Sequence, residues 1–419
     1  MTMVFRELNE IEYEKFVSSH PQANLLQASY SGKRRITDGW NMHLVGMVEN
    51  GKIIASALLS SRKTFFGFYD FECQHGPLVD YDDANKTSLF FKNISSYVKG
   101  KNGLGIKINP NIPLNRYDTS EIIIDDKYDG HKYIELITKS DFSKIDDKLV
   151  DNDPNLLRWY FKKDIKNLHN EDDILNSVSV KTRQDMQRSV KMGVDVEAID
   201  VKDIDIFIKL MKDTGIRRKF SVRDKNYYLS LLNSFGKSRS MCLIAKLNIP
   251  KYIKYLNNRI ENEKYEIDLA ANKSENSPKV KLQITAHKNQ IIQLKEKIKE
   301  AKEKISDPPV VMAGAIFINY GSEMTYLSSG AYTEYSKFCS TYAIQFYAMK
   351  YAVEHKLSVY NFYGTEGLFS GHPEMNGIYN FKKGFSGYLE EQIGYFYKNI
   401  RPIPNFIIAM LRKIRKILR

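Results

Sequence analysis

An interrupted heptad repeat in the middle of the chain is the feature that most constrains the fold. Apolar residues recur at alternating spacings of three and four in two runs of equal length, 249–270 and 284–305, separated by a polar stretch at 272–278. Such a seam is typical of a helix that packs along a second helix. Each run is too short to be stable alone in water, so the two seams have to bury each other. We therefore expect an antiparallel helical hairpin over residues 248–305.

Short apolar or alternating runs lie on both sides of this hairpin and are typical of strands. They are residues 42–48, 52–59, 104–108, 241–246, 310–318, 323–331 and 358–364. The segments with helical spacing are residues 83–99, 176–193, 203–216, 224–235 and 340–355. Within 176–193, Val180, Met186 and Val190 are expected to face the core. The pattern predicts a mixed α/β (α+β) fold with the helical hairpin inserted into it.

The length of 419 residues exceeds one ordinary domain, so we expect at least two. The first domain is expected at residues 1–155. The second is expected at residues 156–247 and 306–400, on either side of the helical arm at 248–305. Residues 401–419 follow as a basic amphipathic helix.

The balance of charge indicates an anionic partner. Lys and Arg number 63 and Asp and Glu number 50, which gives a net charge of +13. An excess of this size favours nucleic acid, a phosphorylated substrate or an acidic membrane surface without choosing among them. A merely basic surface is the alternative. The arm alone carries 13 Lys or Arg and 8 Asp or Glu, a net charge of +5.

Several functional classes are disfavoured by the composition. The three cysteines and eight histidines do not fall at the spacings of a disulfide framework or a metal site, so we expect no metal. The N-terminal segment lacks the apolar run of a signal peptide, and no stretch approaches the roughly 20 apolar residues that span a bilayer. We expect a cytoplasmic protein that is at most peripheral to a membrane.

Signatures of common enzymes are missing from the sequence. It contains no phosphate-binding GxxxxGK[ST] loop, no paired metal-binding histidines and no nucleophile elbow. The glycine-rich stretch 100–105 runs into a strand, whereas a phosphate cradle opens a helix, so we interpret it as a turn. This turn argues against a conventional acetyl-CoA-dependent transferase.

Residues 358–385 hold the densest group of candidate functional residues. A buried strand ends at Tyr363, a loop with glycine and proline follows, and then comes the F-K-K-G-F motif at 381–385. A lysine among aromatic residues suits a cationic donor in a partly desolvated cleft, and Lys382 is the candidate. The alternative is a surface lysine whose stem lies along apolar groups. If the segment is extended, Lys383 points to the other side.

These motifs occur together with others in a recognisable order. The helical hairpin precedes N-F-Y-G at 361–364 and F-K-K-G-F at 381–385. Earlier in the chain come L-L-Q-A-S at 25–29 before Lys33 and Arg34, H-G-P-L-V-D-Y at 75–81, Lys181 with Arg183, and Arg223-Asp224 before Tyr227-Tyr228. The ordered set resembles the FemA, FemB, FemX and MurM (FemABX) aminoacyltransferases, with most likeness to the FemA/FemB branch. These enzymes build the interpeptide bridges of bacterial peptidoglycan.

The resemblance implies a fold, substrates and site residues. It implies two tandem GNAT-like domains with an inserted coiled-coil arm, no acetyl-CoA and no other cofactor. The donor is an aminoacyl-tRNA, and the acceptor is an amine on the lipid-linked peptidoglycan precursor. By similarity, the residues that bind the acceptor and line the site are Arg34, Arg223, Tyr227, Tyr326 and Tyr363. Phe381 and Lys382 match the pair beside the reacting ester.

Three positions depart from the family's pattern. Asn109 stands where an aspartate is frequent, and an amide cannot serve as a general base at neutral pH. His75 replaces an arginine, which puts any role that needs a permanent charge in doubt. Tyr30 stands where a tryptophan is frequent.

The function expected from these observations is aminoacyl transfer from tRNA to a peptidoglycan-precursor amine. Glycine is the first choice of amino acid, and serine and alanine are open. Lys288, Lys295 and Lys299 on the arm are the expected contacts to tRNA. The alternatives are a non-catalytic nucleic-acid-binding coiled-coil protein and a GNAT acyltransferase that uses acyl-CoA. A homodimer, or a dimer with a related transferase, is also open.

The C-terminal residues 402–419 have an amphipathic pattern. Apolar residues recur at helical spacing at Phe406, Ile407, Met410, Leu411, Ile414, Ile417 and Leu418, and basic residues fill the other face at Arg412, Lys413, Arg415, Lys416 and Arg419. Such a helix can lie in the headgroup plane of an anionic membrane. The alternative is a helix packed against the first domain with a basic exterior. A lipid-linked acceptor favours contact with the inner face of the cell membrane.

Overall fold

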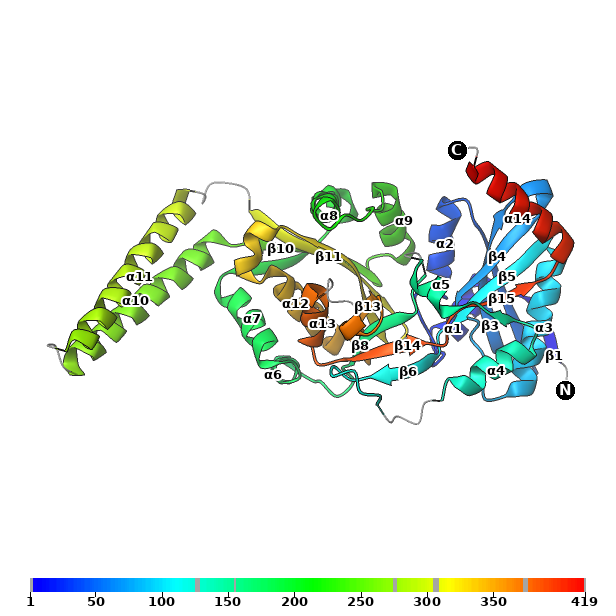
Figure 1. The fold of residues 1–419 in the computed structure, drawn as a ribbon, viewed down its shortest axis with the longest axis horizontal. Coiled ribbons are helices and arrows are strands. Elements are labelled where there is room, and N and C mark those ends of the chain that lie inside the picture. Colours follow the sequence, from blue (N-terminus) through cyan, green and yellow to red (C-terminus); the bar gives the residue numbers. More distant parts are fainter. Residues whose placement is uncertain are drawn as a thin grey trace.

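The molecule consists of two β-sheets and a projecting pair of long helices (Figure 1). The computed structural model describes residues 3–124, 129–153, 156–273, 277–303, 309–371 and 376–417. The first sheet has seven strands and the second has eight. Figure 1 shows the helical pair projecting from the second sheet on the side away from the first, while both ends of the chain lie beside the first sheet.

The first half of the molecule follows a simple order of elements. They are β1 (Met3–Glu7), α1 (Glu10–Val17), α2 (Ser29–Thr37), β2 (Asn41–Glu49), β3 (Lys52–Lys63), β4 (Tyr69–His75), α3 (Ala84–Gly100) and β5 (Gly103–Pro110). Strands β1 to β4 pair antiparallel in sequence order. Strand β4 then pairs parallel with β5, and α3 makes the crossover that a parallel pair requires.

The second half repeats this order with one insertion. Its elements are β9 (Val194–Ile199), α8 (Asp205–Arg218), α9 (Lys225–Phe235), β10 (Ser240–Leu247), β11 (Val310–Tyr320), β12 (Glu323–Ala331), α12 (Ser340–Glu354) and β13 (Val359–Thr365). Strands β9 to β12 pair antiparallel, and β12 pairs parallel with β13. The helical arm stands between β10 and β11, where the first half has the short β2–β3 turn. The chain therefore contains one topology twice, with the arm inserted into the second copy.

The two sheets exchange strands across the boundary that we expected at residue 155, a residue outside the described ranges. Strand β15 (Phe396–Asn399) comes from the end of the chain but lies between β5 and β7 (Ser143–Lys144) in the first sheet. Strand β6 (Pro113–Tyr117) precedes the boundary but pairs with β14 (Tyr388–Gln392) in the second sheet. Strand β8 (Trp159–Asp164) joins β14 to β13. Each sheet is therefore completed by a strand that is distant in sequence.

The arm consists of α10 (Ile249–Lys273) and α11 (Pro278–Glu303), which pack together as the heptad seam predicts. Its buried seam residues include Leu256, Ile260, Leu294, Ile298 and Ala301, and they are continuous with the core of the second sheet. Farther out, His287 Nδ1 lies 2.6 Å from Glu263 Oε2, a polar pair within the seam. Ile305, the last expected seam residue, lies outside the described ranges.

The remaining helices cover the sheets and the junction. They are α4 (His131–Lys139), α5 (Asp147–Asp151), α6 (Glu171–Asn176), α7 (Val180–Lys191), α13 (Asn376–Lys383) and α14 (Pro402–Ile417). Helix α3 shares a core with Phe71 of β4. Asp70, the preceding residue of β4, points to the opposite face, where its carboxylate pairs with Arg412 of α14. Helices α3 and α14 therefore lie on opposite faces of the first sheet. Among the described residues, no helix combines the length and apolar content needed to cross a membrane.

Two expectations about local structure are wrong. Val180 and Val190 do not face the core, because they are 60% and 56% exposed, while the polar residues Thr182, Asp185 and Ser189 are buried. These polar side chains find partners; Asp185, for example, accepts from the Cys339 thiol. The first part of the F-K-K-G-F motif is also not extended, because it forms the last turn of α13.

Candidate active site

The two parallel strand pairs differ in how far they stay together. In the first half, β4 and β5 pair from Tyr69 to His75. In the second half, β12 and β13 pair only where Glu323–Thr325 lies against Val359–Asn361. Beyond that point both strands carry β-bulges in their pairing with other neighbours. Because bulges bend a strand and redirect its side chains, β12 and β13 separate beyond Thr325 and Asn361, and we call this separation of the two strands the opening.

Lys382 reaches this opening from α13. Its side chain is buried, and its Nζ donates to the carbonyl oxygen of Gly364 at 2.8 Å and to that of Tyr363 at 3.4 Å. Both carbonyls belong to the bulged end of β13, where Tyr363 has a left-handed φ of 63°. A non-glycine residue in this conformation is strained, and such residues cluster at functional sites. The bulge therefore aims two backbone oxygens at one ammonium group.

Lys382 can gain or lose its proton near neutral pH because its neighbours are uncharged. Burial lowers the pKa of Lys382 to about 7, since a charged amine is disfavoured away from water. Among the described residues, no carboxylate pairs with it. An ammonium carries three donors, and two of them are occupied by carbonyls. Lys382 can therefore offer one charged hydrogen bond, or a proton, to a group that enters the opening.

Aromatic rings pack against one another around Phe381, the residue before Lys382. Phe381 is half-buried, with its ring centroid 5.1 Å from those of Tyr342 and Phe385. Phe385 in turn packs on Phe362 at 4.7 Å. Tyr326, one residue beyond the last β12–β13 pair, stacks on Phe317 and donates to Ser329 Oγ. Phe381, Tyr326 and Tyr342 thereby join the hydrophobic core of the second half as partly buried members.

A second group of predicted residues meets where α2 of the first half packs against α9 of the second. The guanidinium of Arg34 lies 4.9 Å from the centre of the Tyr227 ring, and that of Arg223 lies 5.4 Å from it. Arg34 also pairs with Asp38 at 2.8 Å, while Arg223 is exposed. Two guanidinium groups on one ring form a site suited to phosphate or carboxylate, because arginine presents its donors as a fork.

Tyr363 links the two groups. Its backbone carbonyl faces Lys382, and burial raises the pKa of its phenol, with Tyr227 and Arg223 near enough to act on it. Its ring meets Tyr160 edge to face at 5.9 Å. Tyr160 in turn bonds through its hydroxyl to His75 Nε2 of the first half at 2.7 Å. The site therefore lies at the junction of both halves.

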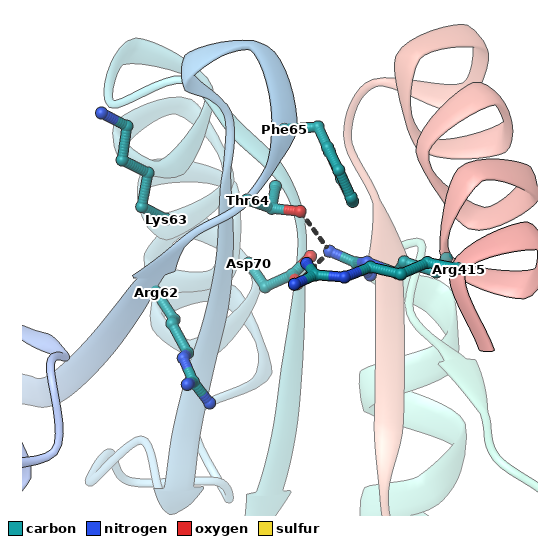
Figure 2. A pocket seen from close by; sticks show the side chains of 7 residues that line it. Arg62, Lys63, Thr64, Phe65, Asp70 and Arg415 are labelled. Atoms are coloured by element: carbon teal, nitrogen blue, oxygen red, sulfur yellow. Dashed lines mark hydrogen bonds and ion pairs between the residues drawn. The ribbon is translucent and has the colours of Figure 1, made fainter. Parts of the chain in front are cut away.

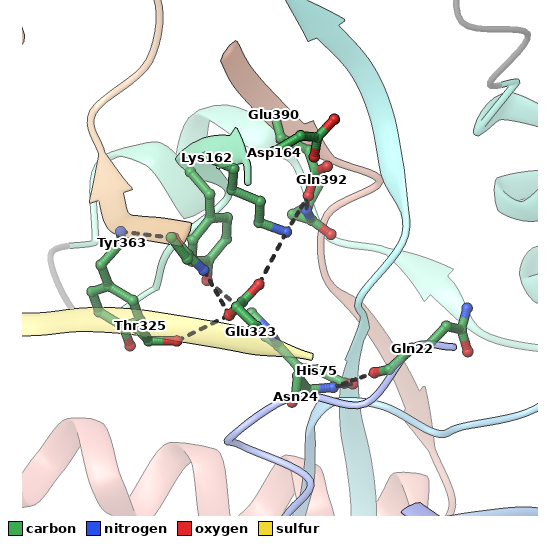
Figure 3. A network of polar contacts seen from close by, with 12 residues as sticks. Gln22, Asn24, His75, Lys162, Asp164, Glu323, Thr325, Tyr363, Glu390 and Gln392 are labelled. Carbon is green, nitrogen blue, oxygen red and sulfur yellow. Dashed lines mark hydrogen bonds and ion pairs between the residues drawn. The ribbon is translucent and has the colours of Figure 1, made fainter. Parts of the chain in front are cut away.

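Beneath this junction lies a network of buried charges (Figure 3). Lys162 Nζ is 2.5 Å from Glu390 Oε1 and 3.9 Å from Glu323 Oε2. Burial alone would lower the pKa of Lys162, but the Glu390 and Glu323 carboxylates raise it above the ordinary value. Glu323 also accepts from Thr325 and Asn361 at the last paired position of β12 and β13. Lys162, Glu323 and Asn361 also line a small pocket at the junction, together with Tyr363.

Two departures from the family's pattern also lie at the junction. His75 is buried, and burial lowers its pKa to about 3, so its ring is neutral and cannot replace a permanently charged arginine. Asn109 accepts from the His75 backbone N–H through its side-chain oxygen at 3.1 Å. An amide therefore serves here as a structural acceptor.

The predicted site residues thus form three groups. Lys382, Phe381, Tyr363 and Tyr326 surround the opening, while Arg34, Arg223 and Tyr227 form the inter-half site. Lys288, Lys295 and Lys299 are exposed on one side of α11 in the arm, apart from both. The sequence interpretation missed Lys162, Glu390, Glu323 and Tyr160. A signal for them exists in W-Y-F-K-K-D at 159–164, where two lysines stand inside an apolar strand.

Comparisons with known proteins agree with this architecture. The chain matches the FemAB family over residues 8–413. Aminoacyltransferase FemA of Staphylococcus aureus, from strains bovine RF122 / ET3-1 and MW2, is 27% identical over 422 residues, covering 99% of this chain and 99% of the relative. The crystal structure of FemX matches with a TM-score of 0.78 at 24% identity, covering 97% of this chain and 100% of that one.

The likeness to FemX extends to the whole fold, and the predicted mixed α/β class with two halves and an inserted helical arm is confirmed. The match to the FemAB model covers far more than half of the chain. The chain therefore belongs to the FemAB family, and the predicted enzyme class, an aminoacyltransferase, is confirmed.

Proposed function

We propose that this protein transfers an aminoacyl group from aminoacyl-tRNA to an amine of the lipid-linked peptidoglycan precursor, and so extends the interpeptide bridge of the cell wall. The observation that carries the proposal is the buried Lys382 ammonium at the opening of the second sheet, in a member of the FemAB family. A lipid-linked acceptor would bring the enzyme to the inner face of the cell membrane.

The chemistry asks little of the protein beyond position and charge. The acceptor amine attacks the carbonyl carbon of the ester, a nitrogen–carbon bond forms, and the bond from that carbon to the tRNA ribose oxygen breaks. Negative charge develops first on the carbonyl oxygen and then on the ribose oxygen. The third N–H of Lys382 stabilises this charge. The amine's proton leaves to water or to the ribose oxygen, which departs as a hydroxyl.

The acceptor is held by the arginine–tyrosine site. Precursors of this class carry phosphates, and Arg34 with Arg223 on Tyr227 provides two guanidinium forks at the junction of the halves. From there the peptide of the acceptor passes Tyr363 toward Lys382. Tyr326 and Phe381 line the apolar walls around the reacting groups.

The donor tRNA extends from the opening to the arm. Positions 288, 295 and 299 are seven and four residues apart, which places the three lysines on one face of α11. All three are exposed, so their charges are available to phosphates. This assignment gives the net charge of the arm a function.

The direct test is reconstitution with defined substrates. Purified protein is mixed with the precursor and with tRNAs charged with glycine, serine or alanine, and the acceptor is analysed by mass spectrometry. We expect addition of one amino acid, with glycine preferred. Transfer from acyl-CoA in place of tRNA would support the acyltransferase alternative. RNA binding without transfer to any acceptor would support the non-catalytic alternative.

A further inference from the structure

Helix α14 turns its most apolar face away from the protein. It is attached by a narrow side, where Ile408 is 1% exposed, Asn405 donates to the Tyr397 hydroxyl at 2.7 Å, and Arg412 pairs with Asp70 at 2.5 Å. The opposite side carries five large apolar residues that are between 47% and 76% exposed: Ile403, Phe406, Ile407, Met410 and Ile414. At 3.6 residues per turn, these five fall within about 100° of the helix circumference.

Next to this helix lies a basic groove (Figure 2). It is lined by Arg62, Lys63, Thr64, Phe65, Asp70, Arg412 and Arg415. Its one carboxylate, Asp70, already pairs with Arg412, so the other three cations have no acidic partner in the lining. Such a groove attracts an anionic group of the size of a phosphate.

The turn between β3 and β4 completes the surface. Phe65 lines the groove across from α14, and the next residue, Phe66, is 75% exposed. Phe66 has a φ of 57°, a conformation that costs energy for a bulky residue. The turn therefore presents an aromatic ring to solvent directly after Phe65, which lines the groove.

The combination of charges and apolar groups favours a lipid surface over other occupants. A second copy docked on this face would bring the basic residues Arg62, Lys63 and Arg415 of both copies together. An RNA would use the cations but would leave the aliphatic stripe without a partner. An anionic bilayer matches both features, since phosphates lie above an acyl region.

We propose that α14 and the β3–β4 turn form a docking surface for anionic phospholipid bilayers. The five apolar residues of α14 and Phe66 enter the acyl boundary, and lipid phosphates occupy the groove between Arg62, Lys63 and Arg415. The helix lies in the plane of the interface. This inference rests on contacts of the first half and not on the transfer reaction, so it stands or fails separately from the proposed function.

The experiment is co-sedimentation of the full chain with vesicles of phosphatidylglycerol or of phosphatidylcholine. We expect binding to phosphatidylglycerol that weakens with salt, and little binding to phosphatidylcholine. Phe406→Ser with Met410→Ser, and separately Lys63→Glu with Arg415→Glu, should each weaken binding about tenfold or more. The matched controls are Ile11→Ser, an 84% exposed apolar residue of α1, and Lys92→Glu on α3 of the opposite face. Both controls should bind as the wild type does.

Each variant is checked for thermal unfolding and for transfer to a soluble precursor without a lipid tail, which should be unchanged. The proposal is overturned if the wild type ignores phosphatidylglycerol vesicles, or if both double variants bind them as well as the controls do. It is also overturned if the wild type is a dimer that Phe406→Ser with Met410→Ser converts to a monomer, while vesicle binding is absent.

Discussion

Two buried lysines in the second half have opposite surroundings. Lys162 lies between two carboxylates, which raise its pKa despite burial, whereas burial lowers the pKa of Lys382 to about 7. A lysine held permanently charged by a buried partner is a structural cation. A lysine that titrates near neutrality responds to whatever enters the site, as catalytic groups do. The pair explains why Lys382, and not Lys162, is the candidate for chemistry.

The first prediction concerns the pH dependence of transfer. If Lys382 acts as a cation, its contribution is present below pH 7 and is lost as pH rises, because a lowered pKa leaves the amine neutral above that value. Lys382→Arg keeps a charge at every pH. The ratio of the wild-type rate to the Lys382→Arg rate should therefore fall about tenfold per pH unit above 7. The titration of the acceptor amine cancels in this ratio. A ratio that stays constant between about pH 6 and 9 would exclude a cationic role.

For single residues, the sequence indicates Lys382 as the candidate but does not give its protonation state. The F-K-K-G-F motif makes Lys382 a candidate beside the alternative of a surface lysine, and the resemblance to the family selects it. Its pKa depends on its burial beside the end of β13, and packing between segments that are distant in sequence decides that. For the same reason the neutral state of His75 is set by burial against Tyr160, which lies 85 residues later in the chain.

Among elements, the long ones were predicted and the short functional ones were not. The arm and the strands β2, β3, β5 and β10 to β13 carry clear periodicity, and the structure has them within a few residues of the expected ranges, whereas β1, β4 and β9 were not predicted. Helix α13 was not among the predicted helices, and Lys383 was assigned to the other side only if its segment were extended. Its helical turn directs Lys382 to the β13 carbonyls, while the Lys383 ammonium lies 4.6 Å from the centre of the Phe369 ring. Eight residues are too few for periodicity to distinguish helix from strand reliably.

The second prediction tests the arm. Replacing Lys288, Lys295 and Lys299 with glutamate should raise the KM for aminoacyl-tRNA by about tenfold or more at physiological salt, with little change in the KM for the precursor. The matched control is Lys279→Glu with Lys297→Glu, which changes the opposite flank of α11. Steady-state transfer at several salt concentrations measures both constants. If the triple variant and the control variant change the KM for aminoacyl-tRNA equally, or if only the KM for the precursor changes, a role for this face in donor binding is contradicted.

At the scale of the whole molecule, exchanged strands connect the two halves. Strand β15 lies inside the first sheet although it is the last strand in the chain, and β6 lies in the second sheet although it precedes that half. Strand β15 has four residues and β6 has five. Hydrophobic patterning in such short strands does not show that they pair with distant strands, so each would be placed in the sheet of its neighbours in sequence. The division into two similar halves followed from the resemblance to the FemABX family, whereas the exchange of strands was not predicted. The active site at the junction depends on both.

The third prediction concerns truncation. A chain that ends at Arg401 lacks only α14 and should remain folded, with transfer to a soluble precursor intact. A chain that ends at Gln392 also lacks β15, which leaves β5 and β7 without the strand between them, so the first half should fail to fold. Thermal unfolding and limited proteolysis compare the two. Similar stability of both chains would show that β15 is dispensable.

The fourth prediction concerns Glu390, whose carboxylate joins three strands of the second sheet. It pairs with Lys162 of β8 and with Arg116 of β6, and it is 2% exposed. Glu390→Ala should lower the free energy of unfolding by about 3–5 kcal/mol, because it removes the nearer partner of the buried Lys162 ammonium and leaves only Glu323 at 3.9 Å. Glu390→Ala combined with Lys162→Met should recover much of the loss.

Burial alone would raise the pKa of Glu390, but Lys162 and Arg116 hold it below the ordinary value, so its contribution is lost as pH falls below about 4.5. Chemical denaturation at neutral and acidic pH measures the free energy of unfolding of the wild type and of both variants. If Glu390→Ala is as stable as the wild type, this role of Glu390 is contradicted.

The central claim is that Lys382 acts on the reacting ester in an aminoacyl-tRNA-dependent transfer. It is tested most directly by single-turnover transfer from charged tRNA to the precursor, with wild type, Lys382→Met and Lys383→Met compared at saturating substrates and with their folding verified. We predict that Lys382→Met is slower by about 10²–10³, because it removes a donor that meets charge only in the transition state. Lys383→Met should remain close to wild type. Equal rates for Lys382→Met and wild type would contradict the account.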